Sequence, residues 1–223
     1  MLMQTPRSAF AASQPAAPAP MADLFDAFNL MGSQMTLGPN EEIFGEKEPA
    51  EYVYKVVSGA VRTYTILKDG RRQIGAFYLP GEIFGLEIDN EHQLSAEAIG
   101  STVVRVVRRS AVMSLAERDG EVARALWSLT ARALYRAQEH VMLLIKSAQQ
   151  RVACFLLEMS DRIAATDTVE LPMSRQDIAD YLGLTIETVS RTMSQLASES
   201  SIGLPSARRI VLRNRRALNA LNA

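Results

Sequence analysis

The stretch that most constrains how this 223-residue chain can fold is SRQDIADYLGLTIETVSRTMSQL, which runs from Ser174 to Leu196. It predicts two short helices joined by a tight turn. Ser174 and Asp177 have the spacing of a capping box at the start of the first helix. Gly183 can adopt the positive φ that ends this helix, and Thr185 is a suitable N-cap for the second. The stretch therefore predicts a helix-turn-helix.

The second helix is expected to have one apolar face and one polar face. Val189 and Met193 lie one turn apart and are expected to pack against the first helix. The opposite face carries the candidate base contacts to DNA, which are Glu187, Ser190 and Arg191. A carboxylate can accept a hydrogen bond from cytosine N4, and an arginine can donate two to guanine. An ordinary helical hairpin remains an alternative, as does a surface ion pair between Glu187 and Arg191.

Candidate contacts to DNA phosphates surround this helix. The run from Arg208 to Arg213 (RRIVLR) predicts a strand of a wing beside the helix-turn-helix. The residues that we expect to contact phosphates are Thr185, Thr188, Ser174, Arg208 and Arg209. Residues 171–223 hold seven arginines and four acidic residues, a net charge of +3, whereas the rest of the chain carries −4. Positive charge is therefore concentrated where double-stranded DNA would bind.

The composition predicts a globular protein without a membrane anchor. Hydrophobic residues make up 48% of the chain, which is enough for packed cores. No apolar run approaches the roughly 18 residues of a membrane span. The N-terminus lacks the basic start and unbroken apolar core of a secretory signal, so residues 1–22 are expected to form a disordered tail and the protein to be cytoplasmic.

Upstream of the helix-turn-helix, the sequence pattern has the period of β-strands. Short β-rich runs separated by turns extend from Glu41 to Arg108, and Asp69-Gly70 is a hairpin signal. A short amphipathic helix is expected before them, at residues 21–30. We therefore expect a β-roll over residues 23–112, followed by helices, in a chain of the α+β class.

The helical region predicts a dimer. A long helix is expected within residues 113–147, with a break near Lys146, and residues 148–223 are expected to form the winged helix-turn-helix domain. Two neighbouring apolar stripes suggest that one flank packs on the roll and the other on the same helix of a second chain. The residues assigned to this homodimer contact are Leu126, Leu129, Ala133, Leu134, Ala137, Val141 and Leu144. A helix buried inside a single domain remains the alternative.

This order of elements, from about residue 24 to 218, resembles the Crp/Fnr superfamily of bacterial transcription regulators. The segments that carry the resemblance are VSGAVR, LPGEIFG, LTARAL, AQEHVMLL, RVACFLLEMS and MSRQDIADYLGLTIETVSRTMSQL. The run IETVSR, with Ile186 and Ser190, is similar to the FixK branch rather than the cyclic-AMP receptor branch. The resemblance implies dimeric binding to TTGAT–N4–ATCAA repeats, activation through RNA polymerase, and a role in oxygen-limitation or nitrogen-metabolism control.

The resemblance also bears on the effector. Nucleotide-binding members follow a glycine, here Gly85, with a carboxylate that holds the ribose, and they hold the phosphate with an arginine. This chain has Leu86 and Leu94 at those two positions. A buried phosphate without a guanidinium partner would lose charge-assisted hydrogen bonds. We therefore expect no cyclic nucleotide.

The remaining cofactors and an enzymatic role are also not expected. The iron–sulfur cluster of the superfamily needs four cysteines, and the sequence has only Cys154, which apolar neighbours are expected to bury. His92 and His140 could ligate haem, but such residues are more often ordinary polar side chains on a loop or helix face. Neither a cofactor nor a metal is therefore expected, and a haem- or redox-dependent gas sensor of the same superfamily is the alternative. No nucleophile elbow, HExxH motif or phosphate-binding glycine loop indicates an enzyme.

Overall fold

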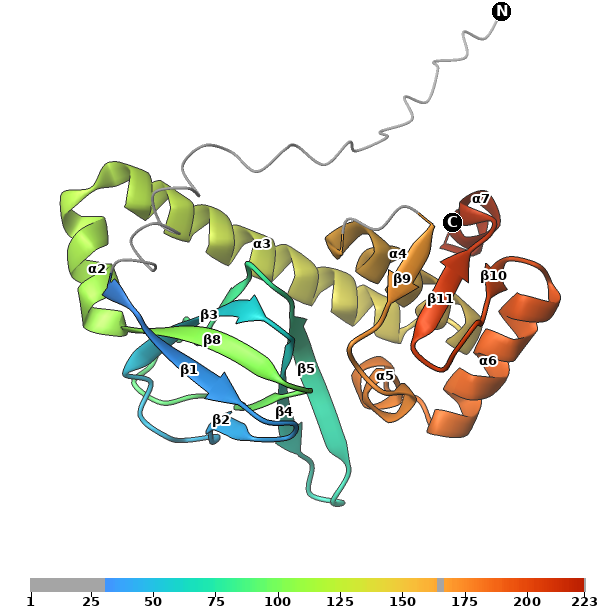
Figure 1. Ribbon diagram of the computed structural model, residues 1–223, viewed down its shortest axis with the longest axis horizontal. Coiled ribbons are helices and arrows are strands. Elements are labelled where there is room, and N and C mark those ends of the chain that lie inside the picture. The colour runs from blue at the N-terminus through green and yellow to red at the C-terminus, as the bar shows by residue number, and fades with distance from the viewer. Residues whose placement is uncertain (1–30, 164–166, 223) are drawn as a thin grey trace, which may run out of the picture.

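The computed structural model describes residues 31–163 and 167–222. The tail expected over residues 1–22 and the helix expected at 21–30 lie outside the described residues. Figure 1 shows a β-roll at one end of the molecule and a small α/β domain at the other, with the long helix α3 passing from one to the other. None of the described helices is long and apolar enough to span a membrane.

The roll consists of two four-stranded antiparallel sheets. The first has the strand order β1 (Ser33–Leu37), β8 (Thr102–Arg108), β3 (Tyr52–Ser58) and β6 (Ile83–Phe84). The second has the order β2 (Glu42–Phe44), β7 (Ser95–Ala98), β4 (Val61–Ile66) and β5 (Arg72–Tyr78). The predicted roll is confirmed. The sequence reading did not identify β1, β2 or β6, because β2 and β6 are very short and β1 is exposed along most of its length.

The interior of the roll is filled with side chains from both sheets. Phe44, Tyr54 and Phe84 pack against one another, with ring centroids 5.1–6.1 Å apart. Val56, Val61 and other inward-facing residues complete this core. The alternating sequence pattern follows from this arrangement, since successive residues of a strand point to opposite faces of its sheet.

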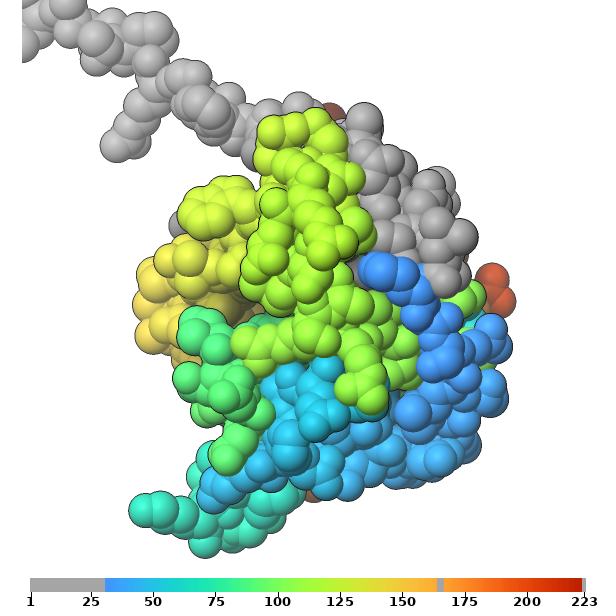
Figure 2. Space-filling model, turned by 90° about the vertical axis from the view of Figure 1, so that its left-hand side faces the viewer, coloured from blue at the N-terminus to red at the C-terminus, as the bar shows by residue number. Residues whose placement is uncertain are grey.

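Two helices follow the roll. α2 (Arg109–Arg118) is joined to α3 (Gly120–Leu144) at Asp119, whose side chain caps α3 by accepting hydrogen bonds from two of its first backbone N–H groups. Val122 and Ala125 are buried against the roll together with Val53 and Val107. Figure 2 shows α2 and the start of α3 as a yellow-green ridge above the blue and cyan strands. The beginning of α3 is thereby fixed to the roll.

The C-terminal domain is a winged helix-turn-helix. Its elements are α4 (Ala148–Arg162), β9 (Thr168–Glu170), α5 (Arg175–Leu182), α6 (Ile186–Ser198), β10 (Ile202–Gly203), β11 (Arg209–Leu212) and α7 (Arg215–Asn222). The three strands form one sheet in the order β10-β11-β9. α3 ends at Leu144 and α4 begins at Ala148, so the helix is interrupted near Lys146. Ser147 starts α4 by forming a capping box with Gln150.

The two parts of the molecule share a continuous apolar core. Ile74, Phe77 and Leu79 of the roll belong to the same buried cluster as the core of the C-terminal domain. The ring of Phe77 lies 5.2 Å from that of Tyr181 in α5 and 6.2 Å from that of Phe155 in α4, measured between centroids. The helix-turn-helix is therefore packed on its own roll.

Candidate DNA-binding site

The first helix of the helix-turn-helix, α5, begins and ends as its sequence predicts. The Ser174 side chain accepts a hydrogen bond from the backbone N–H of Asp177, and the Asp177 carboxylate accepts one from the backbone N–H of Ser174. Gly183 ends the helix with φ of 61°, in the left-handed region. Ile178 and Leu182 are buried, so the apolar face of α5 points into the domain core.

The second helix, α6, presents one face to this core and the other to solvent. Its N-cap is Thr185, whose hydroxyl accepts a hydrogen bond from the backbone N–H of Thr188 at 3.2 Å. Val189, Met193 and Leu196 have no exposed surface. Because these residues repeat at intervals of four and three, they form one face of α6, and most residues of the opposite face are exposed.

The three candidate base contacts lie on the part of α6 that faces away from the core. Glu187 and Arg191 are exposed and Ser190 is half-buried. Hydrogen bonds from its own backbone N–H and from Thr185 hold the pKa of the Glu187 carboxyl below its usual range. Among the described residues, neither Glu187 nor any other carboxylate forms an ion pair with Arg191. An anionic acceptor and an available guanidinium therefore lie side by side.

The candidate phosphate contacts fall into two groups. Thr185 and Thr188, whose hydroxyls are 3.1 Å apart, lie at the N-terminus of α6, and Arg208 and Arg209 are exposed at the start of β11. Ser174 differs from these residues, because its hydroxyl donates to the Asp177 carboxylate at 2.7 Å within the capping box. The structure therefore gives Ser174 a role in starting α5.

One arginine that the sequence reading missed connects α3 to the helix-turn-helix. Arg151 of α4 donates to the carbonyl of Leu144 at 2.5 Å, at the end of α3, and to that of Lys146 at 2.9 Å. It also donates to the carbonyl of Leu182 at 2.9 Å, at the end of α5. A single guanidinium thus satisfies one backbone carbonyl at the end of α3 and one at the end of α5. Contacts of this kind depend on tertiary packing and leave no local sequence signal.

The residues assigned to dimerisation divide between two faces of α3. Leu126 and Leu129 are half-buried and pack against the roll core of their own chain. The other five members of the set are exposed, namely Ala133, Leu134, Ala137, Val141 and Leu144. Trp127, which was not assigned, is 77% exposed and precedes Leu134 (59%) and Val141 (63%) at seven-residue intervals. This interval is typical of a coiled-coil seam.

Leu86 and Leu94, which the resemblance places at the two nucleotide-anchor positions, have different surroundings. Leu86 is 40% exposed. Leu94 packs over Gly75, where an added Cβ would come within 2.7 Å of its Cδ1 atom. The Leu94 side chain therefore occupies the space above Gly75, and the absence of a side chain at residue 75 leaves room for it.

The two histidines lie in different environments. His92 lies on a loop, as expected, but it is buried: only 1% of its surface is exposed and its ring stacks on Phe44 at 3.5 Å between centroids. Its Nδ1 atom lies 3.3 Å from the Glu87 carboxylate. His140 is half-buried against Tyr181, and burial lowers the pKa of its imidazole. Both rings thus pack against aromatic residues.

The single cysteine lies within the apolar surface of α4. Cys154 is half-buried, and burial raises the pKa of its thiol. A thiol with a raised pKa is a poor nucleophile near neutral pH. Within the described ranges, no group of three or more His, Cys, Asp or Glu side chains is arranged to hold a metal ion.

The fold and the exposed helix define a DNA-binding protein with a winged helix-turn-helix and a roll of the nucleotide-binding type. Residues 150–221 match the Crp-like helix-turn-helix domain, and residues 34–119 match the cyclic nucleotide-binding domain. The nitrogen fixation regulation protein FixK of Azorhizobium caulinodans is 49% identical over 199 residues, which are 86% of this chain and 80% of that protein. This chain therefore belongs to the FixK branch of the Crp/Fnr superfamily of transcription regulators.

Other relatives agree with this placement. The transcriptional activatory protein AadR of Rhodopseudomonas palustris is 41% identical over 182 residues, which are 79% of this chain and 76% of that protein. The solved structure of FixK2 from Bradyrhizobium japonicum is 55% identical, with a TM-score of 0.83, and the match covers 86% of this chain and 98% of that one. The matched helix-turn-helix domain and these relatives group the chain with DNA-binding regulatory proteins.

Proposed function

We propose that this protein is a transcription activator that binds TTGAT–N4–ATCAA repeats as a homodimer. The observation that carries the proposal is the outward face of α6, where Glu187 and Arg191 are exposed beside Ser190. Arg191 would donate two hydrogen bonds to the guanine of each half-site, and Glu187 would accept from amino groups of the opposite bases. Thr185, Thr188, Arg208 and Arg209 would fix the position of the helix by contacting phosphates.

The second part of the proposal is the dimer. The exposed apolar residues at seven-residue intervals on α3 support a coiled-coil seam between two chains. Such a dimer would place two copies of α6 in successive major grooves, about 34 Å apart along one face of the duplex. The inverted repeat of the DNA site matches the two-fold symmetry of the protein.

The third part is activity without a bound effector. Leu86 and Leu94 stand where nucleotide-binding members have polar anchors, and Leu94 fills the space above Gly75. We propose that neither a cyclic nucleotide nor an iron–sulfur cluster is required for DNA binding. By analogy with the nitrogen fixation regulators, the protein would act in the cytoplasm in oxygen-limitation or nitrogen-metabolism control and would contact RNA polymerase once bound.

The proposal is tested by measuring the affinity of metal-free protein for a TTGAT–N4–ATCAA duplex in a gel-shift experiment without added ligand. We expect specific binding, and we expect Arg191→Ala to weaken it by about 1–3 kcal/mol per half-site while reducing discrimination at the guanine. Arg216→Ala, which removes an exposed arginine of α7, is the control and should retain discrimination.

Two results would contradict this proposal. Binding that appears only after a small molecule is added would show that the roll needs an effector. An equal loss on every DNA sequence in Arg191→Ala would make this residue a phosphate contact, because phosphate contacts carry no base information.

A further inference from the structure

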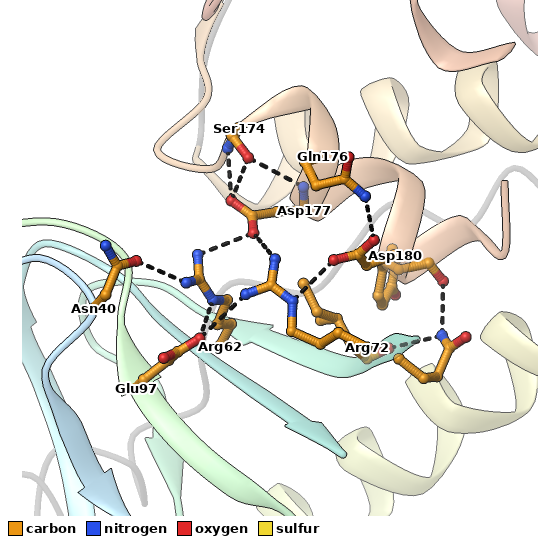
Figure 3. A network of polar contacts seen from close by, with 11 residues as sticks. Asn40, Arg62, Arg72, Glu97, Ser174, Gln176, Asp177 and Asp180 are labelled. Atoms are coloured by element: carbon orange, nitrogen blue, oxygen red, sulfur yellow. Dashed lines mark hydrogen bonds and ion pairs between the residues drawn. The ribbon is translucent and has the colours of Figure 1, made fainter. Parts of the chain in front are cut away.

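A buried network of charged side chains joins the roll to the helix-turn-helix. The roll contributes Arg62 from β4, Arg72 from β5 and Glu97 from β7, and α5 contributes Asp177 and Asp180. Figure 3 shows the two guanidinium groups between the carboxylate of the roll and those of α5. The roll residues precede those of α5 by 80 or more positions, so the network forms only when the two parts of the molecule pack together.

Asp177 is the centre of the network. Its Oδ1 atom accepts hydrogen bonds from Arg62 Nη1 at 2.9 Å and from Arg72 Nη2 at 2.6 Å. Its Oδ2 atom accepts from the backbone N–H and the hydroxyl of Ser174, at 2.8 Å and 2.7 Å. The residue that completes the capping box of α5 is therefore also a residue that attaches this helix to the roll.

The surrounding groups satisfy both arginines. Arg62 also donates to Glu97 at 2.7 Å and to Asn40 at 2.8 Å, while Arg72 donates to Asp180 at 2.8 Å and to Glu97 at 3.2 Å. The side chains of Arg62 and Asp177 are only 6% and 4% exposed. Buried ion pairs contribute little net stability, because desolvation offsets their attraction, but removal of one partner is costly. Such a network therefore favours one docked geometry over others.

This docked geometry relates α3, which would form the dimer, to α6, which would bind DNA. The start of α3 is fixed on the roll through Val122 and Ala125. The network holds α5 on the same roll, and α5 carries α6 through the tight turn at Gly183. Glu82 of the roll adds a second tie through Arg162 at the end of α4, at 2.7 Å. The angle between α6 and α3 is thus fixed by contacts within one chain.

We propose that Arg62, Arg72, Asp177 and Asp180 are positioning residues that fix the orientation of α6 relative to α3 and thereby determine which half-site spacing the dimer selects. The inference rests on the proposed dimeric binding to inverted repeats. None of these four side chains belongs to the proposed base contacts. Changes to them should therefore alter the choice of spacing and leave base preference within each half-site unchanged.

The experiment compares affinities for TTGAT–N4–ATCAA and for the same half-sites separated by six base pairs. In Arg72→Met we expect the preference for the four-base spacing to fall by about two- to thirtyfold, the range typical of coupling between distant sites. Discrimination at the half-site guanine should stay at the wild-type level. Arg71→Met is the matched control, because this neighbouring arginine is exposed and forms its ion pair with Asp69 within the hairpin.

Two milder variants keep the test decisive if Arg72→Met does not fold. Asp180→Asn should reduce the spacing preference in the same direction, and Arg72→Lys should retain part of it, because a lysine keeps the charge without the planar fork. Equal weakening on both spacings, in a variant that retains wild-type thermal stability, would overturn the proposal.

A second measurement uses the full chain without DNA. Amide hydrogen exchange in residues 174–182 and in β5 should be faster in Arg72→Met than in wild type, and unchanged in Arg71→Met. Unchanged exchange in Arg72→Met would show that the network does not hold the two parts together and would overturn the proposal. If exchange is faster in Arg72→Met than in wild type but wild type does not bind the duplex, the proposed function has failed, although the network still holds the two parts together.

Discussion

Single side chains in this protein often serve two elements at once. Asp177 completes the capping box of α5 and accepts hydrogen bonds from two arginines of the roll, and Arg151 donates hydrogen bonds to carbonyls at the ends of α3 and α5. His140 of α3 lies against Tyr181 of α5, with ring centroids 4.2 Å apart. Substitutions at these positions should therefore change how the C-terminal domain is held, in addition to local stability.

His140 makes a specific contribution to the pH dependence of stability. Burial lowers the pKa of the folded imidazole below its ordinary value of about 6.5. Below about pH 6.5 the unfolded chain takes up a proton that the folded chain does not, so the free energy of unfolding falls as the pH drops toward the folded pKa. Above about pH 6.5 this contribution does not change.

We therefore expect His140→Phe to remove part of the acid destabilisation. Urea unfolding of wild type and variant at equal protein concentration, at pH 7.5 and pH 5.5, checks this expectation. Wild type should lose more of its free energy of unfolding between the two pH values than the variant. Parallel losses in both proteins would show that His140 titrates as freely when folded as when unfolded.

At the scale of elements, the turn between α5 and α6 depends on backbone conformation at one residue. Gly183 has φ of 61°, and a Cβ added there would lie 3.6 Å from Leu144 and 3.7 Å from Arg151, which are ordinary contact distances. The cost of a side chain at this position therefore arises from the left-handed backbone rather than from a clash.

Gly183→Ala should lower the free energy of unfolding by about 1–2 kcal/mol, the cost of a left-handed backbone for a residue with a Cβ. Gly183→Asn should lower it by less, since asparagine tolerates this conformation better. Chemical denaturation of the three proteins measures the difference. A larger loss in the asparagine variant would indicate that space around the turn, and not φ, sets the requirement for glycine.

At the scale of the whole molecule, α3 links the roll, the C-terminal domain and the proposed second chain. Its buried side faces the chain's own roll, whereas Trp127, Leu134 and Val141 are more than half exposed on another side. Exposed apolar residues at seven-residue intervals are costly to leave in water along a helix of 25 residues. A second copy of α3 would cover them.

Leu134→Glu should convert the dimer to monomer and weaken binding to the two-half-site duplex. Analytical ultracentrifugation at micromolar concentration measures the first effect. Glu139→Lys, on the same exposed helix but about 140° around its axis from Leu134, is the control and should remain dimeric. An unchanged sedimentation coefficient in Leu134→Glu would place the dimer contact elsewhere.

Several parts of this structure could be predicted from the sequence because their causes are local. The capping box at Ser174, the glycine at residue 183 and the spacing of Val189 and Met193 are decided within a few residues. These features predicted α5 and α6, and the period of the apolar residues predicted most strands of the roll. Hydrogen bonding within one turn or one strand pair needs no knowledge of distant packing.

Other features were decided by the tertiary structure alone. Arg62 and Asp177 are 115 residues apart, and nothing near either residue indicates that they form an ion pair. The burial of His92 and the side of α3 on which Leu129 packs likewise depend on which surfaces meet. The sequence thus determined the elements and their order through short-range hydrogen bonding and periodicity. Long-range packing determined which buried charges attach the helix-turn-helix to the roll.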